Sequence, residues 1–361
     1  MAGHRRFPSI GPLVARLLVS LTVLSLQPAT SGFAQSNNSR AAEIATYHGP
    51  DREKRLIEGA KKEGEMMLYA SIPVADIAVL TEAFTKKYGI KVKAWRGDSE
   101  AMLQRVLNEA KARRYEVGVM VASSSALEPL SREKLLTPVK SPLLADLIPE
   151  SIAPNREWAS VYLNTFVQAY NTNLVRKEDL PKTYRDLLNP RWKGKLAVEA
   201  EDYDWFAQVV LGLGEAQGLK LFRDIVAANG ISVRRGHSVL NNLIVAGEIP
   251  LGLSAYGFLA EQSKLKGAPL DWFIIPPLLA RPTVAGVSRY APQPHASVLF
   301  YDFLIGDAQP ILASRQFVSP SKKIESPFTR GPLQLIDSVE MLDNAQRWQE
   351  LYQSIVIKAA R

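Results

Sequence analysis

The sequence contains no cysteine among its 361 residues. A disulfide framework, a thiol nucleophile, a zinc-thiolate or iron–sulfur centre and a lipid-modified cysteine are therefore excluded. Long apolar runs are also scarce. After residue 34 each hydrophobic stretch is soon interrupted by a charge, a proline or a glycine, whereas a membrane-spanning helix takes about 20 apolar residues. We expect this part of the chain to be soluble.

Concentrated charge and catalytic motifs are missing as well. The 44 basic and 36 acidic residues are spread along the chain, so no basic face for nucleic acid is predicted. The sequence has no nucleophile motif, no P-loop and no paired histidines, and a hydrolase would have to depend on the carboxylates of 201–204. We therefore expect a binding protein without a cofactor, and keep a hydrolase as a remote alternative.

The N-terminus has the layout of an export signal. Arg5, Arg6 and Arg16 precede an apolar core at 17–26, and small residues lead to Ala34. This pattern is typical of a secretory signal peptide, and its core is too short to span a bilayer. We predict cleavage after Ala34 and free diffusion in the periplasm.

Two α/β domains are predicted for the rest of the chain. Short apolar runs alternate with helical patterns from residue 65 onward, as is typical of domains built around largely parallel sheets. The first series has strands at 66–70, 90–94 and 117–121, and the second begins with a strand at 195–200. About 330 residues exceed what one hydrophobic core usually fills.

A set of short segments, all in the same order, resembles family 1 of the extracellular solute-binding proteins, the receptors of ferric-iron, thiamine and aminoethylphosphonate importers. The segments are LYAS at 68–71, AFTKKYGIKV at 83–92, RGDS at 96–99, YNTN at 170–173, PRWKGK at 190–195, AGEIP at 246–250, APQPH at 291–295 and FYDFL at 300–304. The resemblance implies a type II periplasmic-binding fold, with two α/β lobes that are joined by two crossover strands and close on a ligand by a hinge.

The resemblance also implies the lobe boundaries and the partners. Residues 1–34 are the signal peptide, 35–164 plus 283–361 the first lobe, and 165–282 the second. The partners would be a small-molecule or metal ligand and the permease of an ABC importer in the inner membrane, and the protein would be a monomer. A sensor subunit that presents the same lobes to a membrane receptor would share these features.

The candidate site lies where the strands end. In open α/β sheets ligands bind beyond the carboxyl ends of the strands, near helix N-termini. The first-lobe loops there carry Ser71, Ser99 and Ser124, whose hydroxyls suit a phosphate, a phosphonate or a carboxylate. Helix capping alone would also explain these serines.

The second lobe brings carboxylates and aromatic rings to one strand-to-helix junction. Glu201, Asp202, Tyr203 and Trp205 follow the predicted strand at 195–200. They could ligate a hard cation or stack on a cationic ligand. The alternative is a solvated first helical turn, where acidic residues are favoured by the helix dipole.

The presence of one tyrosine where a pair is expected leaves the identity of the ligand undecided. Ferric-iron members of the family typically bind metal through two adjacent tyrosines at the start of the helix that begins near Tyr256, but here Gly257 follows it. Tyr256, Tyr203 and Glu201 are predicted metal ligands only if the cargo is Fe(III) or its chelate. Thiamine, an organophosphate or phosphonate, or another small organic solute remain alternatives. His237 also lies at a predicted helix start, where capping is the commoner role.

Overall fold

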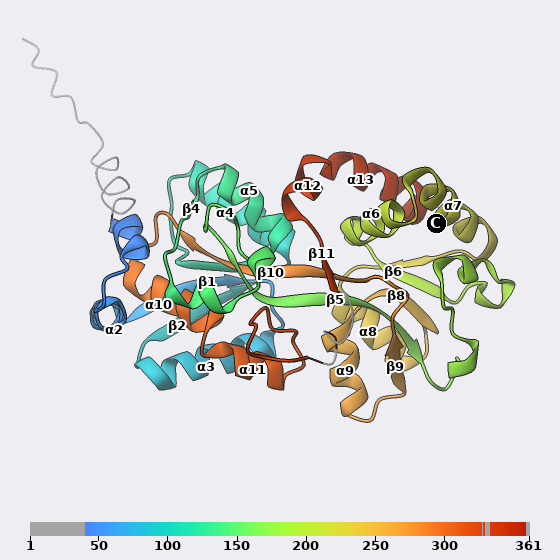
Figure 1. Cartoon of the computed structure of the whole chain (residues 1–361), viewed down its shortest axis with the longest axis horizontal. Helices are drawn as coiled ribbons and strands as arrows, with labels where there is room; N and C mark the ends of the chain where they lie inside the picture. The colour runs from blue at the N-terminus through green and yellow to red at the C-terminus, as the bar shows by residue number, and fades with distance from the viewer. Residues whose placement is uncertain (1–39, 327, 329–332, 359–361) are drawn as a thin grey trace, which may run out of the picture.

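The computed structural model describes residues 40–326, 328 and 333–358. The predicted signal peptide and its cleavage after Ala34 lie outside them. The described residues form two α/β lobes that lie side by side and share one curled sheet (Figure 1). None of the helices within these residues combines the length and the apolar character that crossing a membrane requires.

The first lobe repeats a strand-then-helix unit, as the sequence predicts. β1 pairs in parallel with β2 on one side and β3 on the other. Local signals explain the helix ends, because Gly89 adopts the left-handed conformation that ends α3 and the Asp98 side chain accepts from Ala101 N at the start of α4. The elements are α2 (Arg52–Glu63), β1 (Glu65–Ala70), α3 (Val74–Tyr88), β2 (Lys91–Arg96), α4 (Ser99–Lys111), β3 (Val119–Ser123), α5 (Ser124–Arg132) and β4 (Leu136–Thr137), with α10 (Pro294–Ile305) and α11 (Ala308–Ser314) returning later.

The second lobe has its own series around a shorter part of the sheet. β6 pairs in parallel with β7 and with β8. Its elements are β6 (Leu196–Glu199), α6 (Tyr203–Gly212), α7 (Glu215–Asn229), β7 (Ser232–Arg234), α8 (His237–Ala246), β8 (Leu251–Tyr256), α9 (Gly257–Leu265) and β9 (Leu270–Phe273). Short 3-10 helices lie at Pro142–Asp146, Pro149–Ser151, Lys177–Asp179, Tyr184–Leu188 and Pro190–Trp192.

Two long strands join the lobes, as the family resemblance implies. β5 (Ala159–Asn171) and β10 (Leu278–Ser288) pair antiparallel with each other. β10 continues onto β3 of the first lobe, while β5 pairs with β8 and β9 of the second. Both strands are buried along their whole length. This confirms the predicted two-lobed fold.

The C-terminal stretch packs differently from the prediction. It was assigned to the first lobe, but after β11 (Leu333–Leu335), which pairs with β10, it forms α12 (Ser338–Asp343), α13 (Ala345–Tyr352) and a π-helical turn (Gln353–Ile357). Trp348, Tyr352 and Ile355 belong to the apolar core of the second lobe. The reason is that these large apolar side chains cover α6 and α7, which lie beside them (Figure 1).

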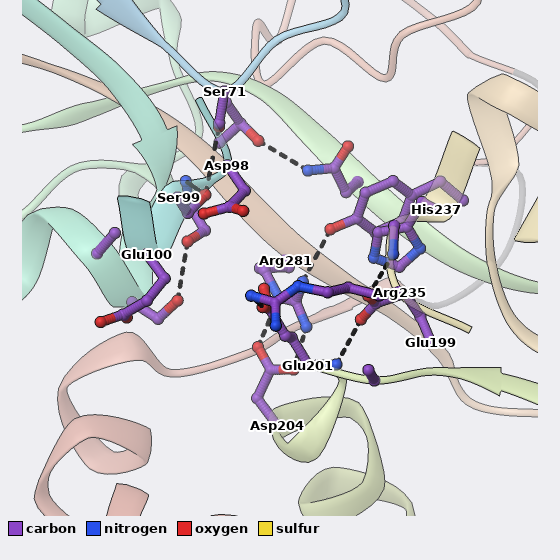
Figure 2. A pocket seen from close by; sticks show the side chains of 18 of the residues that line it. Ser71, Asp98, Ser99, Glu100, Glu199, Glu201, Asp204, Arg235, His237 and Arg281 are labelled. Atoms are coloured by element: carbon purple, nitrogen blue, oxygen red, sulfur yellow. Dashed lines mark hydrogen bonds and ion pairs between the residues drawn. The ribbon is translucent and has the colours of Figure 1, made fainter. Parts of the chain in front are cut away.

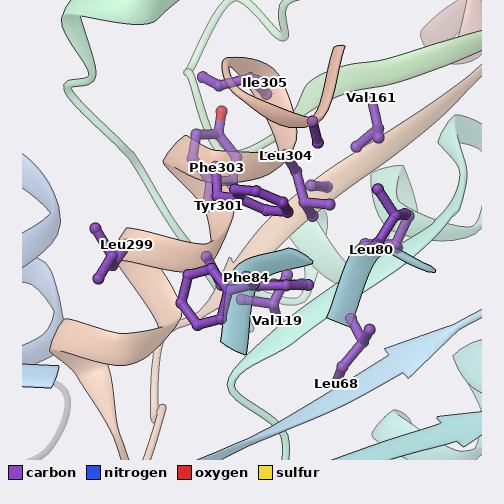
Figure 3. Packing of buried hydrophobic residues seen from close by; sticks show 14 of the residues in the cluster. Leu68, Leu80, Phe84, Val119, Val161, Leu299, Tyr301, Phe303, Leu304 and Ile305 are labelled. Atoms are coloured by element: carbon purple, nitrogen blue, oxygen red, sulfur yellow. The ribbon is translucent and has the colours of Figure 1, made fainter. Parts of the chain in front are cut away.

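Each lobe has its own core. In the first lobe, Phe84 of α3 packs edge-on against Phe300 of α10, with ring centroids 4.9 Å apart. Leu68, Val119 and Leu304 join the same cluster (Figure 3). These contacts cover one face of the first-lobe sheet, and a separate cluster that includes Tyr69, Met120 and Met102 of α4 covers the other face.

Candidate functional site

A cleft of about 860 Å³ lies between the lobes and takes its walls from both. It opens at the carboxyl ends of β1, β2 and β3 on one side and of β6 and β8 on the other. Figure 2 shows Ser71, Asp98 and Ser99 on one wall and Glu201, His237 and Arg281 on the other. Such a volume lies within the usual range for organic ligands, about 300 to 1,000 Å³.

The first-lobe wall is rich in hydroxyl groups. Ser71 and Ser99, both predicted, line the cleft, and Ser99 Oγ donates to Ser71 Oγ over 3.3 Å. Ser99 Oγ also accepts from Ser123 N at 3.2 Å, which ties the starts of α4 and α5 together. Arg96 adds a positive charge to the same wall. Hydroxyls and a guanidinium are groups that bind oxyanions, although Asp98 and Glu100 bring two carboxylates to the same wall.

The start of α5 belongs to the same wall. Its N-cap residue Ser123 makes no capping hydrogen bond, so the first-turn N–H groups have no partner within the helix. Ser123 and Ser125 line the cleft with their hydroxyls 2.9 Å apart. Ser124, the residue predicted to contact ligand, instead turns inward and bonds the Ser338 hydroxyl. Ser124 therefore does not line the cleft, because neighbouring residues of a helix point to different faces.

A buried arginine organises the second-lobe wall. Arg281 projects from β10, and its Nε donates to Asp204 over 2.6 Å, while Nη2 donates to Asp202 over 2.9 Å. Its Nη1 donates to the Tyr256 hydroxyl over 2.8 Å. The side chain of Arg281 is only 9 % exposed. The carboxylates and the phenol that could attract a cation are thus already bound to an internal one.

One group of side chains could hold a metal ion. Ligand atoms of Glu199, Asp202 and His237 lie within 4.8 Å of one another. Both Glu199 oxygens accept backbone N–H groups, from Glu201 and from Gly236. Asp202 Oδ2 and His237 Nδ1 are buried without a hydrogen-bond partner among the described residues. This group differs from the predicted set of Tyr256, Tyr203 and Glu201.

The two carboxyl groups differ in their pKa. Burial raises the pKa of Glu199, and the charge of Asp202 adds to the effect. Burial also opposes ionisation of Asp202, but His237 and Arg281 outweigh it and lower the pKa of that carboxyl. Asp202 is therefore an internal counterion of the wall, and it lies beneath the cleft surface rather than on it.

Tyr256 lies in the cleft without a tyrosine beside it. Its ring stacks on His237, with centroids 3.4 Å apart, and burial raises the pKa of its phenol well above the usual range. A Cβ at position 257 would approach Thr165 Oγ1 to 2.4 Å and Phe328 to 2.7 Å. Position 257 therefore has no room for a second tyrosine in this arrangement.

Two other predicted residues line the cleft and one does not. Glu201 and Tyr203 face it, and Glu201 pairs with Arg235 over 2.8 Å at the exposed rim. Burial raises the pKa of Tyr203 to about 12. Trp205 is buried in the second-lobe core, with its ring edge-on to Phe222 at 6.0 Å. The prediction of Trp205 as a stacking platform was wrong, because its position on α6 faces the core.

Sequence reasoning missed Arg281. The residue lies on β10, whose other residues are mostly apolar. A single charge in such a strand is a signal, because a buried charge requires partners. Asn164 of β5 also lines the cleft and donates to Thr283 of β10 over 2.7 Å.

Two α/β lobes, two crossover strands and a ligand-sized cleft between them define a two-lobed binding protein. The chain belongs to the bacterial extracellular solute-binding protein family, whose model matches residues 116–328. Membership marks it as an extracellular solute-binding protein.

Relatives and solved structures agree with this assignment. Iron uptake protein A1 of Synechocystis is 24% identical over 326 residues, covering 85% of this chain and 87% of the relative. Iron-bound HitA from Pseudomonas aeruginosa has a TM-score of 0.70 at 20% identity, covering 81% of this chain and 99% of that one. AfuA from Actinobacillus pleuropneumoniae with fructose-6-phosphate has a TM-score of 0.72 at 18% identity, covering 82% and 99%.

Proposed function

We propose that this protein is the periplasmic receptor of an ABC importer, which captures a small solute between its lobes and presents it, as a monomer, to the permease. Family membership and the cleft shared by both lobes support capture of a solute. The signal-like N-terminus supports release into the periplasm after cleavage at Ala34. Lobe closure on the ligand would create the surface that the permease recognises.

The ligand that the cleft fits best is an organic solute with an oxyanion group. The observation that carries this proposal is the contrast between Arg281, which donates to Asp202, Asp204 and Tyr256, and the first-lobe wall, where the hydroxyls of Ser71, Ser99 and Ser125 line the cleft beside Arg96. Attraction for a cation is reduced on one wall, and donors for an anion face the cleft from the other. The cleft volume leaves room for a body attached to the anion.

A thermal-shift and calorimetry screen tests this ligand class. The purified chain would be titrated with inorganic phosphate, carboxylates, phosphate esters and phosphonates. A ligand at 100 times its Kd stabilises the folded state by about 2.7 kcal/mol, and small-angle scattering should report lobe closure with the same ligand. Absence of binding by every oxyanion would overturn the ligand class. A scattering profile that stays open with a bound ligand would contradict capture by closure.

Ferric ion is the second candidate, and it has its own supporting observation. Glu199, Asp202 and His237 form a compact group with two buried atoms that lack partners, and relatives are named for iron uptake. If Fe(III) is the cargo and Tyr256, which stacks on His237, joins this group as a ligand, ferric citrate should stabilise the protein and give a phenolate-to-iron absorbance band. Tyr256→Phe should abolish the band. No shift and no band in the wild type would exclude this candidate.

A further inference from the structure

The C-terminal segment from α12 through the π-helical turn, residues 338–357, contributes a third wall to the cleft. We call this segment the C-terminal arm. It lies beyond residues 116–328, which the family model matches. In Figure 1 it arches from α5 of the first lobe to α6 and α7 of the second. The arm therefore lies at the place where a ligand would bind.

Both ends of the arm are fixed. At the first lobe, the Ser338 hydroxyl bonds Ser124, and Asp343 pairs with Arg132 over 2.6 Å. At the second lobe, Tyr352 packs on Phe206 with centroids 5.4 Å apart, and its hydroxyl donates to the Glu199 carbonyl over 2.5 Å. These contacts hold one face of α13 against the cleft.

The face toward the cleft carries a regular stripe. Gln349, Gln353 and Ile357 are four residues apart and all line the cleft, together with Tyr352. Gln349 is exposed, and Gln353 and Ile357 are partly exposed, so their side chains are accessible. The last part of the stripe lies on a π-helical turn, a geometry that is frequent at functional sites.

The chemistry of the stripe suits an uncharged polar group. Each glutamine amide offers two donors and an acceptor without a charge, which matches hydroxyl groups rather than a metal ion or a phosphate. Ile357 adds an apolar surface for C–H groups. Across the junction with α6 lie the Tyr203 phenol and the Glu201 carboxylate, which can also bond hydroxyls.

We propose that Gln349, Gln353 and Ile357 recognise the hydroxylated body of a ligand whose oxyanion is held at the start of α5. The ligand class is then a phosphate ester of a sugar or polyol rather than a bare anion. This proposal rests on the proposed function, because it assigns the body of the ligand whose oxyanion the first-lobe wall binds. The arm is a specificity surface in the same cleft.

Calorimetry with two probes tests this assignment. The wild type should bind fructose 6-phosphate more tightly than inorganic phosphate. Q349A/Q353A should weaken fructose 6-phosphate binding about 5- to 30-fold, since each lost neutral hydrogen bond contributes about 1 kcal/mol. Its affinity for inorganic phosphate should not change. Q346A is the matched control, because Gln346 lies on the exposed face of α13 and bonds Glu350 at 3.0 Å. It should leave both affinities unchanged.

The possible results distinguish a failure of the arm's role from a failure of the oxyanion ligand class. Unchanged affinity of Q349A/Q353A for fructose 6-phosphate, or an equal loss for both probes, would overturn the role of the arm while oxyanion binding stands. A wild type that binds inorganic phosphate more tightly than fructose 6-phosphate would also overturn the role of the arm. A wild type that binds neither probe would overturn the role of the arm, and absence of binding across the whole oxyanion screen would overturn the ligand class. An unchanged melting temperature of each variant checks that a loss of affinity is not a loss of fold.

Discussion

The two walls of the cleft differ in how their polar side chains are bonded. On the first-lobe wall Ser71, Ser99 and Ser125 are small and hydroxylated, and they stand beside a helix start whose cap is missing. On the second-lobe wall the charged groups are large and bind one another, with Arg281 at their centre. Donors on the first wall remain for a ligand, whereas the charges of the second mainly hold that wall together.

This difference separates residues that bind from residues that position. A buried charge is costly unless it is paired and hydrogen-bonded, so the network around Arg281 must be nearly complete before a ligand arrives. Uncharged, partly buried serines such as Ser99 and Ser125 carry no such requirement. The comparison predicts large stability effects on the second wall and small, ligand-specific effects on the first.

Replacement of Arg281 should give the largest effect. Arg281→Met would leave Asp202 and Asp204 buried without their main partner, and breaking a buried ion pair costs about 3 to 5 kcal/mol. The measurement is the free energy of unfolding in urea. Arg235→Met is the matched control, since its partner Glu201 is exposed and such pairs contribute about 0 to 1 kcal/mol. Equal losses of unfolding free energy in the two variants would contradict the predicted difference between the two walls.

Trp205 and Tyr203 both lie on α6, but Trp205 is buried in the core whereas Tyr203 lines the cleft. Trp205→Phe should lower the free energy of unfolding by about 1 to 3 kcal/mol because it opens a cavity in the core, and it should leave ligand affinity unchanged. Tyr203→Phe should keep stability close to that of the wild type, since it removes only a hydroxyl at the cleft. A loss of affinity in Trp205→Phe without a loss of stability would place Trp205 in the site after all.

Much of the fold follows from local sequence signals. Alternating strands and helices, with Gly89 ending α3 and Asp98 capping α4, predict the βα units close to their observed bounds. The carboxyl-end rule then brings Ser71, Ser99, Tyr203 and Tyr256 to one cleft. These successes depend on neighbouring residues or on the general topology.

The failures depend on tertiary contacts. Ser124 and Trp205 lie at predicted helix starts, but the rotation of each helix and the packing behind it decide which side chain faces the cleft. Arg281 was missed because its partners are 77 and 79 residues away in the sequence. The C-terminal arm was assigned to the first lobe alone, because nothing local indicates that Trp348 and Tyr352 cover α6 of the second lobe.

The serines at the start of α5 test the first wall. Ser125→Ala should weaken binding of inorganic phosphate about tenfold, since a hydrogen bond to a charged group contributes about 1.5 to 3 kcal/mol. Ser124→Ala is the matched control, because that hydroxyl bonds Ser338 and does not line the cleft. It should leave phosphate affinity unchanged. The two variants would be compared by calorimetry, and equal affinities in both would remove Ser125 from the binding wall.

The pH dependence of stability should be the smallest effect, with opposite signs for the two neighbouring carboxyls of the second wall. The pKa of Asp202 is lowered on folding, so its stabilisation is present above the ordinary value of about 3.9 and is lost as pH falls through the folded value. The pKa of Glu199 is raised, so stability falls as pH rises from about 4.3 through the folded value.

Urea unfolding between pH 3 and pH 7 separates these two contributions. The penalty of Asp202→Asn should grow as pH rises from 3 to 5, because ionised Asp202 is the form that stabilises the wild type. The penalty of Glu199→Gln should shrink with rising pH, because the wild type loses stability as buried Glu199 ionises while the amide does not titrate. Parallel slopes for the two variants would contradict the division of this wall into one charged partner of Arg281 and one carboxyl that burial keeps protonated to higher pH.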